Sequence, residues 1–167
     1  PRSVREGYGT FTESNLNGDL DPDDTSTRTS QRSCADGVTC VAGLGVPCKI
    51  GSYCVAGIEY LCPAGVVGEA EELRTAACSR PCPRGAYCAA GSTAPQLCPA
   101  GKYGASEGLE TEDQCTPTPP GYYSTEGAAT PSACGGPSLH CPGGEGSPRT
   151  VSTGSETFTD ATLDGAP

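Results

Sequence analysis

The chain has 167 residues and a net charge of −10, with twenty Asp and Glu against ten Lys and Arg. It contains no Trp, no Met and two Phe, whereas 24 Gly and 16 Pro make up about a quarter of it. An ordinary apolar core is therefore excluded, because burial at about 25 cal/mol per Å² would not offset an ordering entropy of about 1–2 kcal/mol per residue. The acidic balance also excludes nucleic-acid binding by phosphate neutralisation.

Twelve cysteines, an even number, are the natural substitute for a core. A disulfide that closes a loop of about 15 residues stabilises a chain by roughly 3 kcal/mol in the loop-entropy description. Disulfides persist in oxidising compartments, so the composition predicts an extracellular or cell-surface protein. We see neither a signal peptide nor an apolar run of membrane-spanning length, and we expect no membrane segment in this stretch.

Residues 1–33 are acidic, rich in Ser and Thr and free of cysteine, which predicts a spacer or a single strand, with strand residues around Tyr8–Thr12. Asp19, Asp21 and Asp23 place carboxylates on alternate residues, as in half of a calcium loop. The twelfth-position Glu of such loops is missing. A solvated turn is the main interpretation and weak calcium binding the alternative, so we assign no metal site and no cofactor.

Residues 34–62 contain two short cysteine modules with the pattern Cys-x2-Gly-x2-Cys-x2-Gly. The first begins at Cys34 and the second at Cys48, and a strand is expected at Ile58–Leu61. Glycines at fixed offsets from the cysteines predict turns that need a positive φ, or a backbone packed against a disulfide.

Residues 63–117 form a cysteine-rich repeat with long loops. Cys62 and Cys98 each open a loop that begins Cys-Pro-Ala-Gly and carries a Leu, Leu73 or Leu109, eleven residues further on. The short module that begins at Cys82 lies between the two loops. Helix is expected to be scarce, and Glu69–Ala77 is the stretch whose composition favours it.

Residues 118–147 are a degenerate copy, in which Thr118 and Ser124 stand where Cys82 and Cys88 stand in the preceding module. Two cysteines that are lost together were bonded to each other, which predicts Cys82–Cys88. Analogy and the order of the remaining residues then predict five further bonds: Cys34–Cys40, Cys48–Cys54, Cys62–Cys78, Cys98–Cys115 and Cys134–Cys141. Interleaved pairing is the alternative, because a sequence does not determine connectivity. A short strand is expected at Tyr122–Ser124.

Residues 148–167 repeat the beginning of the chain. Pro148-Arg149-Thr150-Val151 matches Pro1-Arg2-Ser3-Val4, and the match continues without a gap through Thr157-Phe158-Thr159, at an offset of 147 residues. This segment is therefore interpreted as the start of the next 147-residue repeat of a tandem array. Arrays of this kind serve reach or assembly more often than a single catalytic centre.

Consecutive disulfides close local loops, which then stack along the chain rather than around one centre. The predicted fold class is therefore a small disulfide-rich protein made of elongated tandem cysteine-rich repeats, with short β-hairpins and little helix.

Two of the patterns resemble a known family. Cys-Pro-Ala-Gly-Lys-Tyr-Gly at Cys98–Gly104 and Cys-Pro-Arg-Gly-Ala-Tyr-Cys at Cys82–Cys88 are similar to the ephrin-receptor-like (growth-factor-receptor-like) cysteine-rich repeats of large extracellular proteins of protists and algae. The stretch from Cys134 to Cys141 is similar to a junction that recurs in that group. The resemblance implies a structural role at the cell surface. Some members look like subunits of mastigonemes, the glycoprotein hairs of flagella.

Catalysis is not expected. The chain has one histidine, His140, beside Cys141, and a Cys–His nucleophile would need a free thiolate where every cysteine has a disulfide partner. Thiolate zinc sites use two close cysteine pairs, whereas Cys78 and Cys82 are the one close pair here.

The positions of Ser, Thr, Pro and Tyr in the sequence predict contacts with glycans and with other proteins. Neither Asn begins an N-glycosylation sequon, whereas Ser and Thr near Pro, as in Thr116–Pro120, suit O-linked glycans; bare polar linkers are the alternative. A tyrosine precedes the second cysteine position of three modules, where a ring would stack on the disulfide; these are Tyr53, Tyr87 and Tyr123. Tyr8, Tyr60 and Tyr122 are instead candidates for contacts with glycans or neighbouring subunits.

These observations predict a repeat unit of an extracellular structural glycoprotein that assembles with copies of itself into a filament or flagellar hair. The alternative from another class is the stalk of a ligand-binding or adhesive cell-surface receptor. A transmembrane segment in the full gene would favour the receptor, and further copies of the unit would favour the filament.

Overall fold

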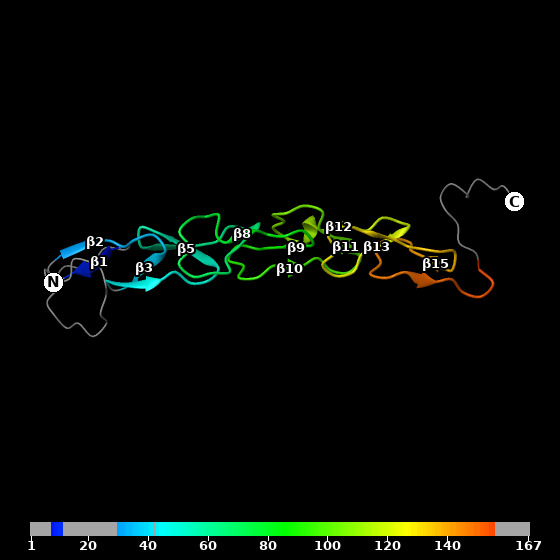
Figure 1. The fold of residues 1–167 in the computed structure, drawn as a ribbon, viewed down its shortest axis with the longest axis horizontal. Coiled ribbons are helices and arrows are strands. Elements are labelled where there is room, and N and C mark those ends of the chain that lie inside the picture. Colours follow the sequence, from blue (N-terminus) through cyan, green and yellow to red (C-terminus); the bar gives the residue numbers. More distant parts are fainter. Residues whose placement is uncertain (1–7, 12–29, 42, 156–167) are drawn as a thin grey trace. The chain divides into compact units, whose positions relative to one another are not determined.

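The computed structural model describes residues 8–11, 30–41 and 43–155. The predicted small disulfide-rich fold is confirmed: the strands form short antiparallel hairpins, and six disulfides each close a local loop. The helical content of the described residues is one 3-10 turn, η1 (Glu112–Gln114). Figure 1 shows the strands as short arrows along the chain. In chain order they are β1 (Tyr8–Phe11), β2 (Ser30–Ser33), β3 (Val38–Val41), β4 (Leu44–Pro47), β5 (Ser52–Val55), β6 (Ile58–Leu61), β7 (Val66–Val67), β8 (Arg80–Pro81), β9 (Ala86–Tyr87), β10 (Gln96–Leu97), β11 (Lys102–Tyr103), β12 (Thr116–Pro117), β13 (Tyr122–Tyr123), β14 (Ser132–Ala133), β15 (Leu139–His140) and β16 (Arg149–Thr150).

The strands pair two by two in chain order, β1 with β2, β3 with β4 and so on, so that every sheet is a two-stranded hairpin. We call each hairpin, with the turn that precedes it, a module, and its first residue the opening residue. The described opening residues are Cys34, Cys48, Cys62, Cys82, Cys98, Thr118 and Cys134. In all but the last of these modules, the residue four positions after the opening residue pairs with the residue just before the next one. Val38 with Pro47, and Ala86 with Leu97, are examples.

A glycine three positions after the opening residue makes the turn into the hairpin in six of the described modules, all but that of Cys134, where this residue is Pro137. Gly51, for example, has a φ of 80°, and Gly85 has a φ of 81°. This left-handed conformation costs a residue with a Cβ roughly 1–2 kcal/mol, which explains the fixed offset of these glycines in the sequence. The turn is closed by a backbone hydrogen bond, such as the 3.1 Å bond from Ser52 N–H to the Lys49 carbonyl.

The chain forms two compact units, one comprising residues 1–81 with 89–94 and the other residues 82–88 with 95–167. The division falls within the cysteine-rich repeat 63–117. Two hydrogen bonds hold the loop 89–94 in the first unit: Gly91 N–H donates to the Cys62 carbonyl at 2.8 Å, and Gly68 N–H to the Ser92 carbonyl at 2.9 Å.

Within the first unit, three backbone hydrogen bonds join the module of Cys48 to the module of Cys62. Gly51 N–H donates to the Gly68 carbonyl at 2.8 Å, and Cys54 N–H donates to the Leu73 carbonyl at 2.8 Å. In the reverse direction, Glu72 N–H donates to the Cys48 carbonyl at 2.9 Å.

The second unit repeats this set of bonds between the modules of Cys82 and Cys98. Gly85 N–H donates to the Gly104 carbonyl, Cys88 N–H to the Leu109 carbonyl and Gly108 N–H to the Cys82 carbonyl, at 2.9, 2.9 and 2.8 Å. Leu73 and Leu109 thus accept equivalent bonds, which accounts for their equal spacing from Cys62 and Cys98. We call this recurring set of bonds the backbone ladder.

Sulfur fills the interior of the modules. Eight cysteines are buried, and the other buried apolar residues of the described chain are Val67 and Ala86. The eight are Cys48, Cys54, Cys62, Cys82, Cys88, Cys98, Cys115 and Cys141. The disulfides therefore take the place of an apolar core, as the composition predicted.

One secondary-structure prediction is wrong: Glu69–Ala77 is not a helix. Glu72 has a φ of 59°, which a right-handed helix excludes. Its N–H donates to the Cys48 carbonyl of the preceding module, so the backbone ladder uses a group that a helix would need for its own bonds.

The three predicted strands lie at β1, β6 and β13. β1 pairs with β2, Tyr8 opposite Ser33, in the register of the other modules. The described part of residues 1–33 is therefore a hairpin rather than a single strand.

Candidate functional site

The opening residues and the positions bonded to them are the most constrained part of the molecule. All twelve cysteines are in disulfides, in the consecutive order expected from the paired loss of two cysteines. The pairs are Cys34–Cys40, Cys48–Cys54, Cys62–Cys78, Cys82–Cys88, Cys98–Cys115 and Cys134–Cys141. A chain with this density of disulfides belongs in an extracellular or secreted setting.

Two kinds of module differ in the residue six positions after the opening residue. In short modules that residue is the bonded cysteine, as in Cys82–Cys88. In the long modules it is Gly68 or Gly104, and the opening cysteine bonds to a residue 16 or 17 positions away. A Cβ on Gly68 would lie 2.7 Å from the Cys62 sulfur and 2.9 Å from the Gly51 Cα, so the long module requires glycine at this position.

Thr118 and Ser124 occupy the positions of a short-module disulfide without one. The Thr118 hydroxyl donates to the Ser124 hydroxyl across 2.7 Å, and the two residues are 4% and 1% exposed. A buried hydroxyl without a partner costs about 1–3 kcal/mol, so each residue satisfies the other. The two positions at which cysteines were inferred to be lost together, 118 and 124, are therefore in contact in the structure.

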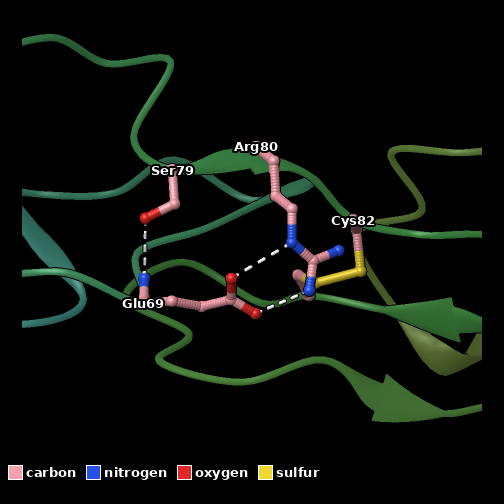
Figure 2. Close-up of polar contacts among 5 residues, drawn as sticks. Glu69, Ser79, Arg80 and Cys82 are labelled. Atoms are coloured by element: carbon pink, nitrogen blue, oxygen red, sulfur yellow. Dashed lines mark hydrogen bonds and ion pairs between the residues drawn. A yellow bond between two sulfur atoms is a disulfide. The ribbon is translucent and has the colours of Figure 1, made fainter.

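An ion pair closes the first long loop. Arg80 donates two hydrogen bonds to the Glu69 carboxylate, from Nη2 at 2.6 Å and from Nε at 3.1 Å. Figure 2 shows this fork, together with the bond from Glu69 N–H to the Ser79 hydroxyl at 2.9 Å. The hydrogen bond that the Arg80 guanidinium donates to the Glu69 carboxylate raises the pKa of Arg80. Both side chains are exposed, so the fork orients the loop more than it stabilises the fold.

A second ion pair lies in the other long module, at different positions relative to the opening cysteine: Lys102 Nζ lies 3.0 Å from Glu112 Oε1. Neither ion pair is predicted by the sequence. Each joins opposite charges ten or eleven residues apart across a long module, a spacing that is not distinctive without the hairpin register.

Exposed apolar side chains occur on hairpins β3–β4 and β5–β6 of the first unit. Tyr60 is 45% exposed and stacks on Tyr53, with ring centroids 5.4 Å apart and planes inclined by 23°. Val41 and Leu61 are 58% and 65% exposed. Tyr60 and Tyr122, two of the predicted contact residues, are exposed, whereas Tyr8 is half-buried. Stacking of Tyr53, Tyr87 and Tyr123 on disulfides remains a prediction.

The residues considered for metal binding or catalysis do not form a cluster in the described chain. His140 is exposed on β15, opposite Arg149 of β16. No group of three or more His, Cys, Asp or Glu within residues 8–11, 30–41 and 43–155 is placed to hold a metal ion. Asp19, Asp21 and Asp23 lie outside the described residues.

The described residues also contain no helix with the length and hydrophobicity needed to cross a bilayer. No protein-family model matches the chain, and no curated protein matches it.

Proposed function

We propose that this chain is a repeat unit of an extracellular structural glycoprotein that assembles with copies of itself into a filament, such as a flagellar hair. The observation that carries the proposal is the backbone ladder. The same three hydrogen bonds join the module of Cys48 to that of Cys62, and the module of Cys82 to that of Cys98. A design in which each module bonds to its neighbours extends by adding modules.

The 147-residue recurrence and the resemblance to ephrin-receptor-like repeats support the same function. A surface protein of this kind needs covalent stability outside the cell, and disulfides supply it. Exposed Thr116, Pro117 and Pro119 are accessible positions for O-linked glycans. Tyr60 and Leu61 offer apolar contact area for lateral association. We expect no enzymatic activity.

Negative-stain electron microscopy of the native protein, prepared without reductant, tests the proposal. We expect filaments with an axial period set by the repeat. Dispersed monomers at all concentrations would contradict filament assembly. Those monomers, together with a transmembrane segment in the full-length gene, would instead establish the receptor stalk.

Mass spectrometry of the same material tests the glycoprotein part separately. The measurement compares how much of Thr116 and how much of Thr118 carries an O-linked sugar. Thr116 is exposed, whereas the Thr118 hydroxyl is buried on Ser124, so we expect modification of the first residue and not of the second.

A further inference from the structure

Val151 occupies the position of an opening residue. Its N–H donates to the Ser138 carbonyl at 2.9 Å. The same bond, also at 2.9 Å, joins five of the described opening residues to the turn of the module before each of them: Cys48 to Gly37, Cys62 to Gly51, Cys98 to Gly85, Thr118 to Gly101 and Cys134 to Gly121. Ser138 is the equivalent turn residue in the module of Cys134, where the separation of the two bonded cysteines is one residue longer than in the short modules. A further module therefore begins at Val151.

The next residues have the backbone of a module's first turn. Gly154, three positions after Val151, has a φ of 87°, the same value as Gly37 and Gly101. Ser155 N–H donates to the Ser152 carbonyl at 3.0 Å, as Lys102 N–H donates to the Pro99 carbonyl at 3.0 Å. Residues 151–155 are thus an ordinary module turn without a cysteine.

The sequence shows which module this is. Val151 and Gly154 match Val4 and Gly7 at the offset of 147 residues, so Ser155 corresponds to Tyr8. Tyr8 begins β1, which pairs with β2, and β2 ends just before Cys34. The turn at Val151 is therefore the first turn of the module that opens the repeat, and the partner strand of that module corresponds to Ser30–Ser33 of a following copy.

The turn glycine of the module that begins at Thr118, Gly121, lacks a contact that the turn glycines of earlier modules make. A Cβ on Gly37 or Gly51 would lie 2.6 Å from the carbonyl oxygen of Glu72 or Gly91, two modules further along. A Cβ on Gly85 or Gly101 would overlap the carbonyl of Gly127 or Gly144 in the same way. No described atom lies within 4 Å of a Cβ built on Gly121. The module two steps after Gly121 is the one that begins at Val151.

We propose that the face formed by hairpin β15–β16 and Gly121 is the docking face for the opening module of a following copy of this chain. The partner is residues 4–33 of that copy, bonded through the same backbone ladder as the modules within a repeat. This inference deepens the proposed function and rests on it, because it names the contact through which repeats join end to end.

A two-copy chain tests the joint, made by adding residues 21–167 after Pro167, so that residues 148–167 are followed by the rest of a second copy. Native-state hydrogen exchange is measured on the amides of Val151 and Ser155 in the one-copy and two-copy chains. Completing the hairpin should slow their exchange by about tenfold or more, the effect of about 1.4 kcal/mol of local stability. Unchanged exchange would overturn the proposal.

A control chain keeps the added length and removes the joint. In it, Ser30 and Gln31 of the second copy are replaced by proline, which prevents pairing of the strand that corresponds to β2. The added protection at Val151 should be lost in this control. Protection that survives would show that the extra chain acts without the docked module, which also contradicts the proposal.

Gly121→Ala supplies a second and independent readout. In the one-copy chain this substitution should lower local stability only through the strain of a positive φ at alanine. In the two-copy chain it should weaken local protection about tenfold more, because the docked module covers the new methyl group. Gly85→Ala, already covered, should have the same effect in both chains. Equal effects of Gly121→Ala in the two chains would refute the docking face.

These measurements are made on dilute monomers, so they separate the joint from filament assembly. Failure of the exchange tests would exclude this joint and leave lateral assembly open. Failure to find filaments by microscopy would leave the joint intact within a stalk.

Discussion

The modules of Cys82 and Thr118 have the same fold, although one has a disulfide and the other does not. Ala86 pairs with Leu97 in the first, and Tyr122 pairs with Ala133 in the second, in the same register. Their turn glycines also make equivalent backbone ladder bonds, both at 2.9 Å, from Gly85 to the Gly104 carbonyl and from Gly121 to the Cys141 carbonyl.

This comparison separates the shape of a module from its stability. The shape follows from the turn glycine, the hairpin register and the backbone ladder, all of which persist when Thr118 and Ser124 replace the cysteines. The disulfide adds stability chiefly by reducing the entropy of the unfolded chain. Four sets of substitutions test this division.

The largest effect is expected from Gly85→Ala. The residue has a φ of 81°, and the new Cβ would overlap the Gly127 carbonyl, so strain and overpacking add to about 3 kcal/mol. Gly121→Ala is the matched control: its φ is 82° and no described atom lies near the Cβ, so about 1 kcal/mol is expected. Hydrogen exchange of the Cys98 and Cys134 amides measures the two losses, and equal losses would show that the contact between modules contributes nothing.

Replacing the disulfide by the hydroxyl pair, in Cys82→Thr with Cys88→Ser, should preserve the hairpin and lower its stability. The ring spans a sequence separation of 6, for which loop entropy predicts a loss of about 2 kcal/mol. Exchange at the Cys98 amide measures it. Loss of the hairpin itself, seen as full exposure of both β9 and β10 amides, would mean that the disulfide also determines the shape.

The reverse exchange, Thr118→Cys with Ser124→Cys, should form a seventh disulfide. The matching bond in the module of Cys82 joins Cα atoms 5.8 Å apart, which is ordinary disulfide geometry. We expect up to about 2 kcal/mol of added protection at the Cys134 amide. Non-reducing peptide mapping must find the 118–124 link; scrambled pairing with Cys134 or Cys141 would contradict the equivalence of the two modules.

The smallest effect is expected from Thr118→Val, which keeps the shape of the side chain and removes the donor to Ser124. A buried hydroxyl left without its partner should cost about 1 kcal/mol. Adding Ser124→Ala should recover much of the lost stability, because no unpaired hydroxyl then remains buried at this site. If the double variant is worse than the single one, packing rather than hydrogen bonding explains the pair.

Several features were predictable because local chemistry determines them. The turn glycines follow from the cost of a positive φ, as at Gly51 and Gly85. The proximity of Thr118 and Ser124 follows from the joint loss of two cysteines. Strands β6 and β13 lie where β-branched and aromatic residues follow a turn.

Other features were not predictable, because they depend on backbone hydrogen bonds, which the side chains of the sequence do not reveal. The helix expected at Glu69–Ala77 is absent, since Glu72 N–H bonds to the preceding module. The strand Ser30–Ser33 has few residues that favour strands, and its pairing with β1 follows from the register at Cys34.

Glycine and cysteine spacing thus made the fold class, the turn positions and the 147-residue period readable from the amino-acid sequence, because this spacing acts over a few residues at a time. Tertiary structure alone decided which carbonyl each turn amide meets, where the two compact units divide, and that Val151 opens a module. The physical reason is that backbone N–H and C=O groups are the same in every residue. Their partners depend on which segments come together in space and not on the identity of the side chains.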